Sequence, residues 1–258
     1  MDALPPAPTS LTCLLVIPFY QDAGRLKPFL RELLGELPAS FSLQIVDDGS
    51  GAEPRRQLEE LIADAAAQSA RAALLPPRHL PVNQGKGAAV RAGWDNYAAY
   101  DLLGFVDADG AVCAREILRL YDYFCAHQDA VDVVIASRVK ILGRHIDRRL
   151  SRHLIGRVFA TAVSLASRLP VYDSQCGYKL LKSRALGQVL PRLCSNRFAF
   201  DVELLMELAA TGAVIHEFPV DWVDQPGSKV KVWRDGFPML LDVCRAARKV
   251  RRNPPQET

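Results

Sequence analysis

Apolar and polar positions alternate in blocks along the first half of the chain, with a period of about thirty residues. Apolar runs predict buried strands, and stretches rich in helix formers predict helices between them. The predicted strands are 11–20, 41–46, 78–82, 102–109 and 131–138, and the predicted helices are 24–37, 53–73, 88–100 and 115–127. Pro28 should confine the first helix or lie in its first turn. This rhythm has the size of a βαβ unit, so we predict an α/β fold whose mostly parallel sheet carries helices on both faces.

The rhythm changes after Arg138. A basic loop is followed by predicted helices at 150–168, 200–212 and 233–250, with a strand at 213–222 and a loop at 223–229 between the last two. No repeat and no long interior linker is present. We therefore predict one domain over 11–250, with a flexible tail at 1–10 and a basic and polar tail at 251–258.

The distribution of charge says more than its total. A formal net charge of +3 does not indicate a nucleic-acid binder, and no nucleic-acid partner is expected. From Arg138 to Arg168, however, the sequence contains eight basic residues and a single acid, Asp147. A second basic cluster lies at 245–252. Clusters of this kind attract phosphates or anionic lipid.

Cysteine usage and the chain start bear on location. Six cysteines show no C-x-x-C pair and no metal-ligand spacing, as is typical of a reducing compartment. The first ten residues lack the features of a signal peptide, and no uncharged apolar run reaches membrane-spanning length. We expect a cytoplasmic protein.

Three polar clusters follow predicted strands: DDGS at 47–50, NQGKG at 83–87 and DADG at 107–110. Carboxyl ends of parallel strands share one sheet edge, so these clusters should converge there. Asp107 and Asp109, two positions apart, should point to the same side and could hold Mg²⁺ or Mn²⁺ together with phosphate oxygens. The alternative is a turn in which one aspartate caps the next helix.

The other two clusters also have two interpretations. Asp48 could accept hydrogen bonds from a nucleotide, or DDGS could be an ordinary turn. NQGKG matches neither the Walker A nor the dinucleotide-binding pattern. Lys86 could meet a diphosphate at a helix start, or the segment could be a plain helix entry.

The predicted helix 150–168 has two faces. Arg157, Thr161, Ser164 and Arg168 share the polar face, and Leu165 and Leu169 belong to the apolar face. Such a helix could pack on the sheet, or it could lie in a membrane interface with its apolar side in lipid.

Taken in order, the motifs resemble those of family-2 glycosyltransferases with the GT-A fold. The similarity is greatest to the branch that glycosylates polyprenyl phosphates, the dolichyl-phosphate glucose and mannose synthases. The matching segments are VIPFY (16–20), VDDGS (46–50), NQGKGAAVRAG (83–93), DADG (107–110), ASR (136–138), DSQCGYKL (173–180), FAFDVELL (198–205), PVDW (219–222) and GSK (227–229). The membrane-spanning helices of many relatives are not expected here, so membrane contact should be peripheral.

The resemblance implies a nucleotide diphosphate sugar as donor, with UDP-glucose favoured and GDP-mannose possible. It implies that Asp107 and Asp109 bind Mg²⁺ or Mn²⁺. The implied donor-binding residues are Pro18, Tyr20, Asp47, Asp48, Lys86, Asp107 and Lys229.

The implied acceptor is a polyprenyl phosphate such as undecaprenyl phosphate. The residues expected around its phosphate are Arg138, Arg148, Arg152 and Ser228, and those expected to act in catalysis are Asp109, Arg138, Asp201 and Glu203. Asp201 and Glu203 should point into the region where the wider family places its base, and should orient arginines or bind sugar hydroxyls. Direct displacement would invert the anomeric centre.

Three other functions stay open at this point: transfer to a hydroxyl acceptor with Asp201 or Glu203 as a true base, sugar-1-phosphate nucleotidyl transfer, and binding without catalysis. The expected location is the cytoplasmic face of the inner membrane, held at the membrane surface directly or through a separate membrane partner.

Overall fold

The structure is a computed structural model, and it describes residues 10–66, 71–139, 146–147, 163–223, 225 and 232–252. Its centre is an eight-stranded sheet in the order β3-β2-β1-β5-β8-β6-β9, with β4 also paired to β2. The strands are β1 Cys13–Phe19, β2 Phe41–Asp47, β3 Ala73–Leu74, β4 Arg78–His79, β5 Leu102–Val106, β6 Val133–Ser137, β8 Tyr178–Lys182 and β9 Ile215–Pro219. A separate parallel pair joins β7 (Ile146–Asp147) to β10 (Trp222–Val223).

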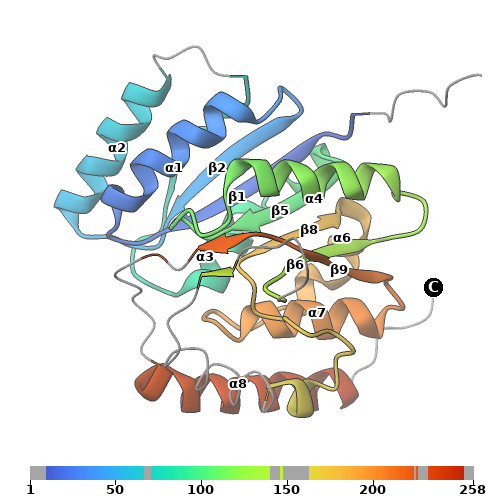
Figure 1. The fold of residues 1–258 in the computed structure, drawn as a ribbon. Helices are drawn as coiled ribbons and strands as arrows, with labels where there is room; N and C mark the ends of the chain where they lie inside the picture. Colours follow the sequence, from blue (N-terminus) through green and yellow to red (C-terminus); the bar gives the residue numbers. More distant parts are fainter. Residues whose placement is uncertain are drawn as a thin grey trace, which may run out of the picture.

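Helices cover both faces of this sheet (Figure 1). They are α1 Ala23–Glu36, α2 Ala52–Ala66, α3 Lys86–Gly93, α4 Ala114–Ala126, α6 Ser183–Val189, α7 Phe200–Ala210 and α8 Val232–Arg252. Side chains of α1, α2 and α4 form one hydrophobic core, and those of α3, α6, α7 and α8 form a second core on the opposite face. The predicted α/β fold, a mostly parallel sheet with helices on both faces, is confirmed.

Strand β1 shows why the sheet needs two cores. Its alternate residues Leu15 and Ile17 face the first core, whereas Leu14 and Val16 face the second. Successive side chains of a strand point to opposite faces, so a strand covered on both sides must be apolar at every position. This accounts for the continuous apolar run in the sequence.

Strand β8 runs antiparallel to both of its neighbours, β5 and β6. The other pairings of the main sheet are parallel. Because β8 is reversed, its first residue, Tyr178, pairs with Val106, the last residue of β5. The segment before β8 therefore lies at the same sheet edge as the carboxyl ends of the parallel strands.

Several predicted boundaries were wrong. Pro28 lies inside α1, beyond its first turn, and the helix continues past it to Glu36. Strand β5 ends at Val106, three residues early, because the chain turns at the DADG segment. Helix α3 starts at Lys86 and stops at Gly93, and a 3-10 helix at Tyr97–Ala99 occupies part of the remainder.

The end of the chain also differs from the prediction. Helix α8 continues to Arg252, two residues into the predicted tail. Of the predicted helix 150–168, residues 163–167 are helical and 150–162 lie outside the described residues. Within the described part of the chain, none of the helices combines the length and apolar character needed to cross a bilayer.

Candidate active site

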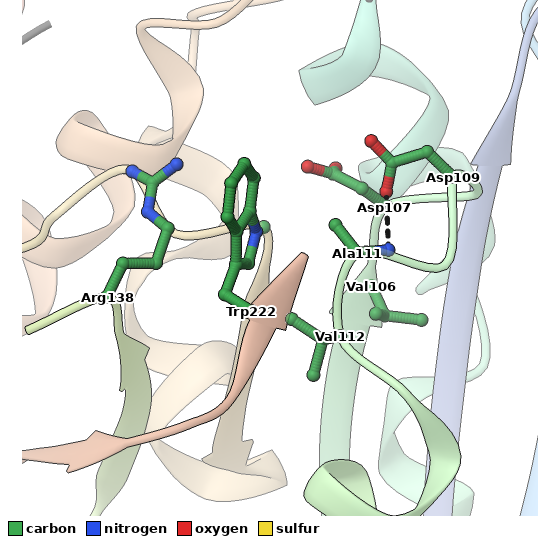
Figure 2. Close-up of a pocket in the computed structure, with 8 residues that line it drawn as sticks. Val106, Asp107, Asp109, Ala111, Val112, Arg138 and Trp222 are labelled. Carbon is green, nitrogen blue, oxygen red and sulfur yellow. Dashed lines mark hydrogen bonds between the residues drawn. The ribbon is translucent and has the colours of Figure 1, made fainter. Parts of the chain in front are cut away.

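The DADG segment forms a tight turn at the end of β5. Asp107 N donates to Gly177 O (3.0 Å), which prolongs the β5–β8 pairing by one bond. Gly110 then adopts a left-handed conformation, with φ 70°. Asp109 Oδ1 accepts from Ala111 N (3.0 Å), the hydrogen bond drawn in Figure 2. One aspartate thus organises the turn, and both carboxylates face the same space.

Neither of the two aspartates is fully buried. The Asp107 side chain is 43% exposed. Burial, and then repulsion from the Asp107 charge, raise the pKa of Asp109 above its ordinary range. Two like charges held this close favour a cation between them, which would relieve the repulsion.

Gly177 makes room for Asp107. A Cβ atom on Gly177 would overlap the Asp107 carboxylate well inside van der Waals contact. The glycine of the DSQCGYKL segment is therefore needed for close packing against a carboxylate on the neighbouring strand.

The residues present fit a magnesium or manganese ion. Oxygen donors of carboxylates are the protein ligands that these ions prefer. Among the described residues, no group of three or more His, Cys, Asp or Glu side chains could hold a metal. A cation on Asp107 and Asp109 would take its remaining oxygen ligands from water or from a bound substrate.

Both aspartates line a pocket at the sheet edge (Figure 2). Arg138, at the end of β6, and Trp222, in β10, complete its polar and aromatic walls. In the view of Figure 2 the Trp222 indole stands between the guanidinium and the two carboxylates. The full lining is Val106, Asp107, Asp109, Ala111, Val112, Arg138, Gly177 and Trp222.

Asp173 fixes Arg138 in place. Arg138 Nε and Nη2 donate to the two Asp173 oxygens at 2.7 and 2.8 Å, and Arg138 N donates to Oδ2 at 3.0 Å. Trp222 stacks on the guanidinium, with its ring centre 5.6 Å from Cζ. Although burial would raise the pKa of Asp173, the Arg138 charge outweighs it and lowers that pKa to about 2. A charged, oriented arginine therefore borders the pocket.

Lys86 brings the NQGKG segment to the DADG turn, so the predicted convergence of these clusters is confirmed. Its Nζ lies 2.8 Å from Asp107 Oδ1 and 3.2 Å from Asp201 Oδ2. Burial lowers the pKa of Lys86, but Asp107 and Asp201 outweigh that effect and leave it raised.

The DDGS carboxylates hold the neighbouring loops. Asp48 accepts from Gln84 N, Gly85 N and Asn83 Nδ2 at 2.7, 2.8 and 2.9 Å. Burial raises the pKa of Asp48 even though these donors favour its charged form. Asp47 accepts from Ser50 N (3.0 Å) and contacts His79 Nδ1 (3.0 Å). Both carboxylates point into the protein here, and their predicted contact with a nucleotide stays a prediction.

Asp201 and Glu203 do not act in one place, which corrects the prediction that both point into the same region. Asp201 binds Lys86 and Lys179 near the pocket. Glu203 accepts from Cys194 N (3.0 Å) and Ser195 N (2.7 Å) and pairs with Lys249 of α8 (3.0 Å). Two residues along a helix are about 200° apart, so the two carboxylates face opposite sides of α7.

The profile described as Glycosyl transferase family 2 matches residues 14–205, about three quarters of the chain. The chain belongs to glycosyltransferase family 2.

Two curated relatives of this glycosyltransferase are named dolichyl-phosphate beta-glucosyltransferase. The protein of that name from Saccharomyces cerevisiae is 27% identical over 244 residues, which cover 89% of this chain and 72% of the relative. The protein of that name from Homo sapiens is 28% identical over 228 residues, which cover 84% and 68%.

Solved structures support the GT-A fold. Glucosyl-3-phosphoglycerate synthase from Mycobacterium tuberculosis superposes with a TM-score of 0.61 at 17% identity, covering 92% of this chain and 82% of that one. A mannosyltransferase from Pyrobaculum calidifontis, solved with GDP-mannose and Mn²⁺, gives a TM-score of 0.63 at 16% identity, covering 96% and 67%. At such identities the likeness establishes the fold of this glycosyltransferase.

Four predicted residues of the family-2 glycosyltransferase, Arg148, Arg152, Ser228 and Lys229, lie outside the described residues. At the start of the site, Pro18 is the penultimate residue of β1, and Tyr20 follows that strand with a partly exposed side chain. Their predicted contacts with the donor stay predictions.

Sequence reasoning missed four residues of this site: Asp173, Gly177, Lys179 and Trp222. The first three belong to DSQCGYKL, and Trp222 ends PVDW. Both segments contribute to the family resemblance, yet no role was assigned within them. Gly177 directly precedes the apolar strand β8, and a glycine beside a buried strand can mark a close backbone approach, which could have directed attention to it.

Proposed function

We propose that this glycosyltransferase transfers glucose from UDP-glucose to a polyprenyl phosphate, with Mg²⁺ or Mn²⁺ at Asp107 and Asp109. The observation that carries the proposal is a pocket lined by two carboxylates on one side and, beyond the Trp222 indole, by the oriented Arg138 on the other. A diphosphate bound through a cation to the carboxylates and an acceptor phosphate bound to Arg138 would meet at the mouth of this pocket, whose volume of about 40 Å³ is too small for both. The names of the curated relatives support glucose as the sugar and a lipid phosphate as the acceptor.

In the donor half, the pocket residues would stabilise the negative charge of the leaving nucleotide. A bound divalent cation would offset the negative charge that develops on the departing nucleotide. Lys86, at the first residue of α3, supplies a second positive charge beside Asp107. Both are electrostatic contributions that grow as the leaving group forms.

In the acceptor half, Arg138 would hold the lipid phosphate beside the sugar. A phosphate monoester with a second pKa of about 6 is mostly dianionic at neutral pH, so its oxygen needs no base to attack. The bond from the anomeric carbon to the diphosphate breaks, the nucleotide leaves with the electron pair, and a bond to the acceptor oxygen forms with inversion. Arg148, Arg152, Ser228 and Lys229 remain proposed contacts of this phosphate.

We also propose that the protein works at the cytoplasmic face of a membrane, directly or through a membrane partner. Arg245, Arg248 and Arg252 lie one turn apart along an exposed stripe of α8. Beside them, Arg251 Nη2 donates to Ala166 O (3.1 Å), next to Leu165, which is 75% exposed. An exposed leucine next to an arginine of this basic helix fits an anionic interface. All six cysteines are free thiols, as a reducing compartment permits.

The test uses the purified protein, undecaprenyl phosphate and a panel of nucleotide sugars, with Mn²⁺, Mg²⁺ or chelator. We expect a lipid-linked sugar with UDP-glucose and metal, no product with chelator, and a β linkage from the α-linked donor. The Asp107→Asn variant should keep its fold and lose turnover.

Other outcomes would redirect the proposal. A lipid product only with GDP-mannose would change the donor and keep the reaction. Product on a soluble alcohol, with none on the lipid phosphate, would favour a hydroxyl acceptor. Release of free glucose without any lipid product would reject the acceptor.

A further inference from the structure

Four charged side chains of alternating sign form a chain that ends at the candidate metal site. Lys179 Nζ lies 2.7 Å from Asp201 Oδ1, and Lys179 is fully buried. Asp201 Oδ2 lies 3.2 Å from Lys86 Nζ, and Lys86 Nζ lies 2.8 Å from Asp107 Oδ1. The candidate metal ligand Asp107 is therefore already paired with a cation that belongs to the protein.

Packing holds this arrangement in register. Both lysines lie over the ring of Phe105, with Nζ 4.9 and 5.2 Å from its centre. Lys86 opens α3, and next to it Gly87 packs so closely on Phe200 of α7 that a Cβ would overlap that ring. Lys179 Nζ also donates to Cys176 O (2.8 Å). The position of Lys86 is thus set by two helices and the sheet.

The charges of this chain bear on how a metal binds. The two lysines of this chain balance the charges of Asp201 and Asp107. Asp109 is therefore the one candidate metal ligand that has no lysine of the chain as its partner. A divalent cation that arrives alone competes with the Lys86 ammonium for Asp107. A cation that arrives with a diphosphate brings negative oxygens that Lys86 can contact instead.

We propose that Lys86 is a built-in counter-ion of Asp107 that competes with the metal, and that Lys179 and Asp201 position it for this role. When metal and diphosphate bind together, the Lys86 ammonium exchanges Asp107 for the diphosphate oxygens, and Asp201 keeps the ammonium close to both. Metal binding is therefore weak without nucleotide and strong with it. The inference rests on the proposed metal site at Asp107 and Asp109.

The experiment measures Mn²⁺ binding to the whole protein from the electron paramagnetic resonance signal of free Mn²⁺, first without nucleotide. We expect Lys86→Met to bind Mn²⁺ about tenfold more tightly than the unsubstituted protein, because a like charge next to the ligand is removed. Lys86→Arg, which keeps the charge, should bind as the unsubstituted protein does. With saturating UDP, the advantage of Lys86→Met should disappear.

Lys182→Met is the matched control. The Lys182 side chain is 14% exposed, against 11% for Lys86, and it pairs with a single carboxylate, Asp132 (3.1 Å), at the opposite end of β8. It should leave Mn²⁺ affinity unchanged. The double variant Lys86→Met with Asp107→Asn should lose the gain, since the competition is for Asp107. Lys86→Gln repeats the test should the Met variant unfold.

The failures of the two proposals are distinguishable. If Lys86→Met and Lys86→Gln fold and bind Mn²⁺ no more tightly than the unsubstituted protein, or if Lys182→Met shows the same gain, the counter-ion inference is wrong. If Mn²⁺ does not bind even with UDP-glucose present, the proposed metal site itself is wrong.

Discussion

At the scale of single residues, Gly177 decides whether Asp107 can reach its position. We expect Gly177→Ala to lower turnover about tenfold or more, because displacing a reacting group by about 1 Å can lower the reaction rate by up to about 10²-fold. Steady-state rates against Mn²⁺ concentration measure this. Gly35→Ala is the control, since a Cβ there meets nothing within 4 Å. Undiminished turnover in Gly177→Ala would show that Asp107 need not stay in place.

The Asp173–Arg138 pair predicts a dependence of stability on pH. The pKa of Asp173 falls from its ordinary 3.8 to about 2 in the folded protein. Its contribution to stability is therefore present above about pH 4 and is lost as the pH falls toward 2. We expect Asp173→Asn to be less stable by about 2 kcal/mol at pH 7, with about half of that difference gone at pH 3. Urea unfolding at both pH values measures it. An equal difference at both would contradict the charge interaction.

Some of the site could be predicted residue by residue. The sequence predicted that Asp107 and Asp109 lie at the end of a strand and point to the same side. In the structure both line one pocket. The sequence did not indicate that Asp48 would be used by the amides of residues 84 and 85, because a hydrogen bond between distant loops leaves no periodic trace. The same holds for the hydrogen bond that Arg138 donates to Asp173.

At the scale of elements, helix α7 places Asp201 at the candidate site and Glu203 on its opposite side, in a structural contact. Glu203 accepts two backbone amides and pairs with Lys249, so it ties α7 to α8 and to the 194–195 turn. We expect Glu203→Gln to lose about 1–3 kcal/mol of stability. Its turnover should stay within a few-fold, whereas Asp201→Asn should lose turnover. Urea unfolding and rates measured on the same preparations check this. A large loss of turnover in Glu203→Gln at full stability would return Glu203 to the catalytic candidates.

Strand positions were predictable, and strand direction was not. Apolar runs identified β1, β2, β5 and β6 because a strand covered on both faces must be apolar throughout. The same run describes a parallel and an antiparallel strand, so the reversal of β8 was hidden. That reversal places Gly177 beside Asp107 and Lys182 at the far end of the strand. The helical period, by contrast, was available in the sequence and would have separated Asp201 from Glu203.

At the scale of the whole molecule, a groove joins the loop before α3 to the basic helix α8. In Figure 1, α8 runs along the side of the molecule opposite α1 and α2. A groove of about 610 Å³ connects Gln84, at the loop before α3, with Arg245 and Lys249 of α8. If α8 rests on an anionic bilayer, this groove, which Arg245 and Lys249 line, lies beside the surface from which a lipid phosphate would come.

This arrangement predicts where membrane affinity resides. We expect the double variant Arg248→Gln with Arg252→Gln to bind phosphatidylglycerol vesicles roughly tenfold or more weakly, because each basic residue near an anionic surface contributes about 1 kcal/mol. Arg55→Gln with Arg56→Gln on α2 removes the same charge from the opposite side and should have little effect. Vesicle sedimentation at low and high salt measures the binding, and the difference should shrink as salt screens the charges. Equal losses in the two double variants would mean that total charge, rather than the α8 surface, determines binding.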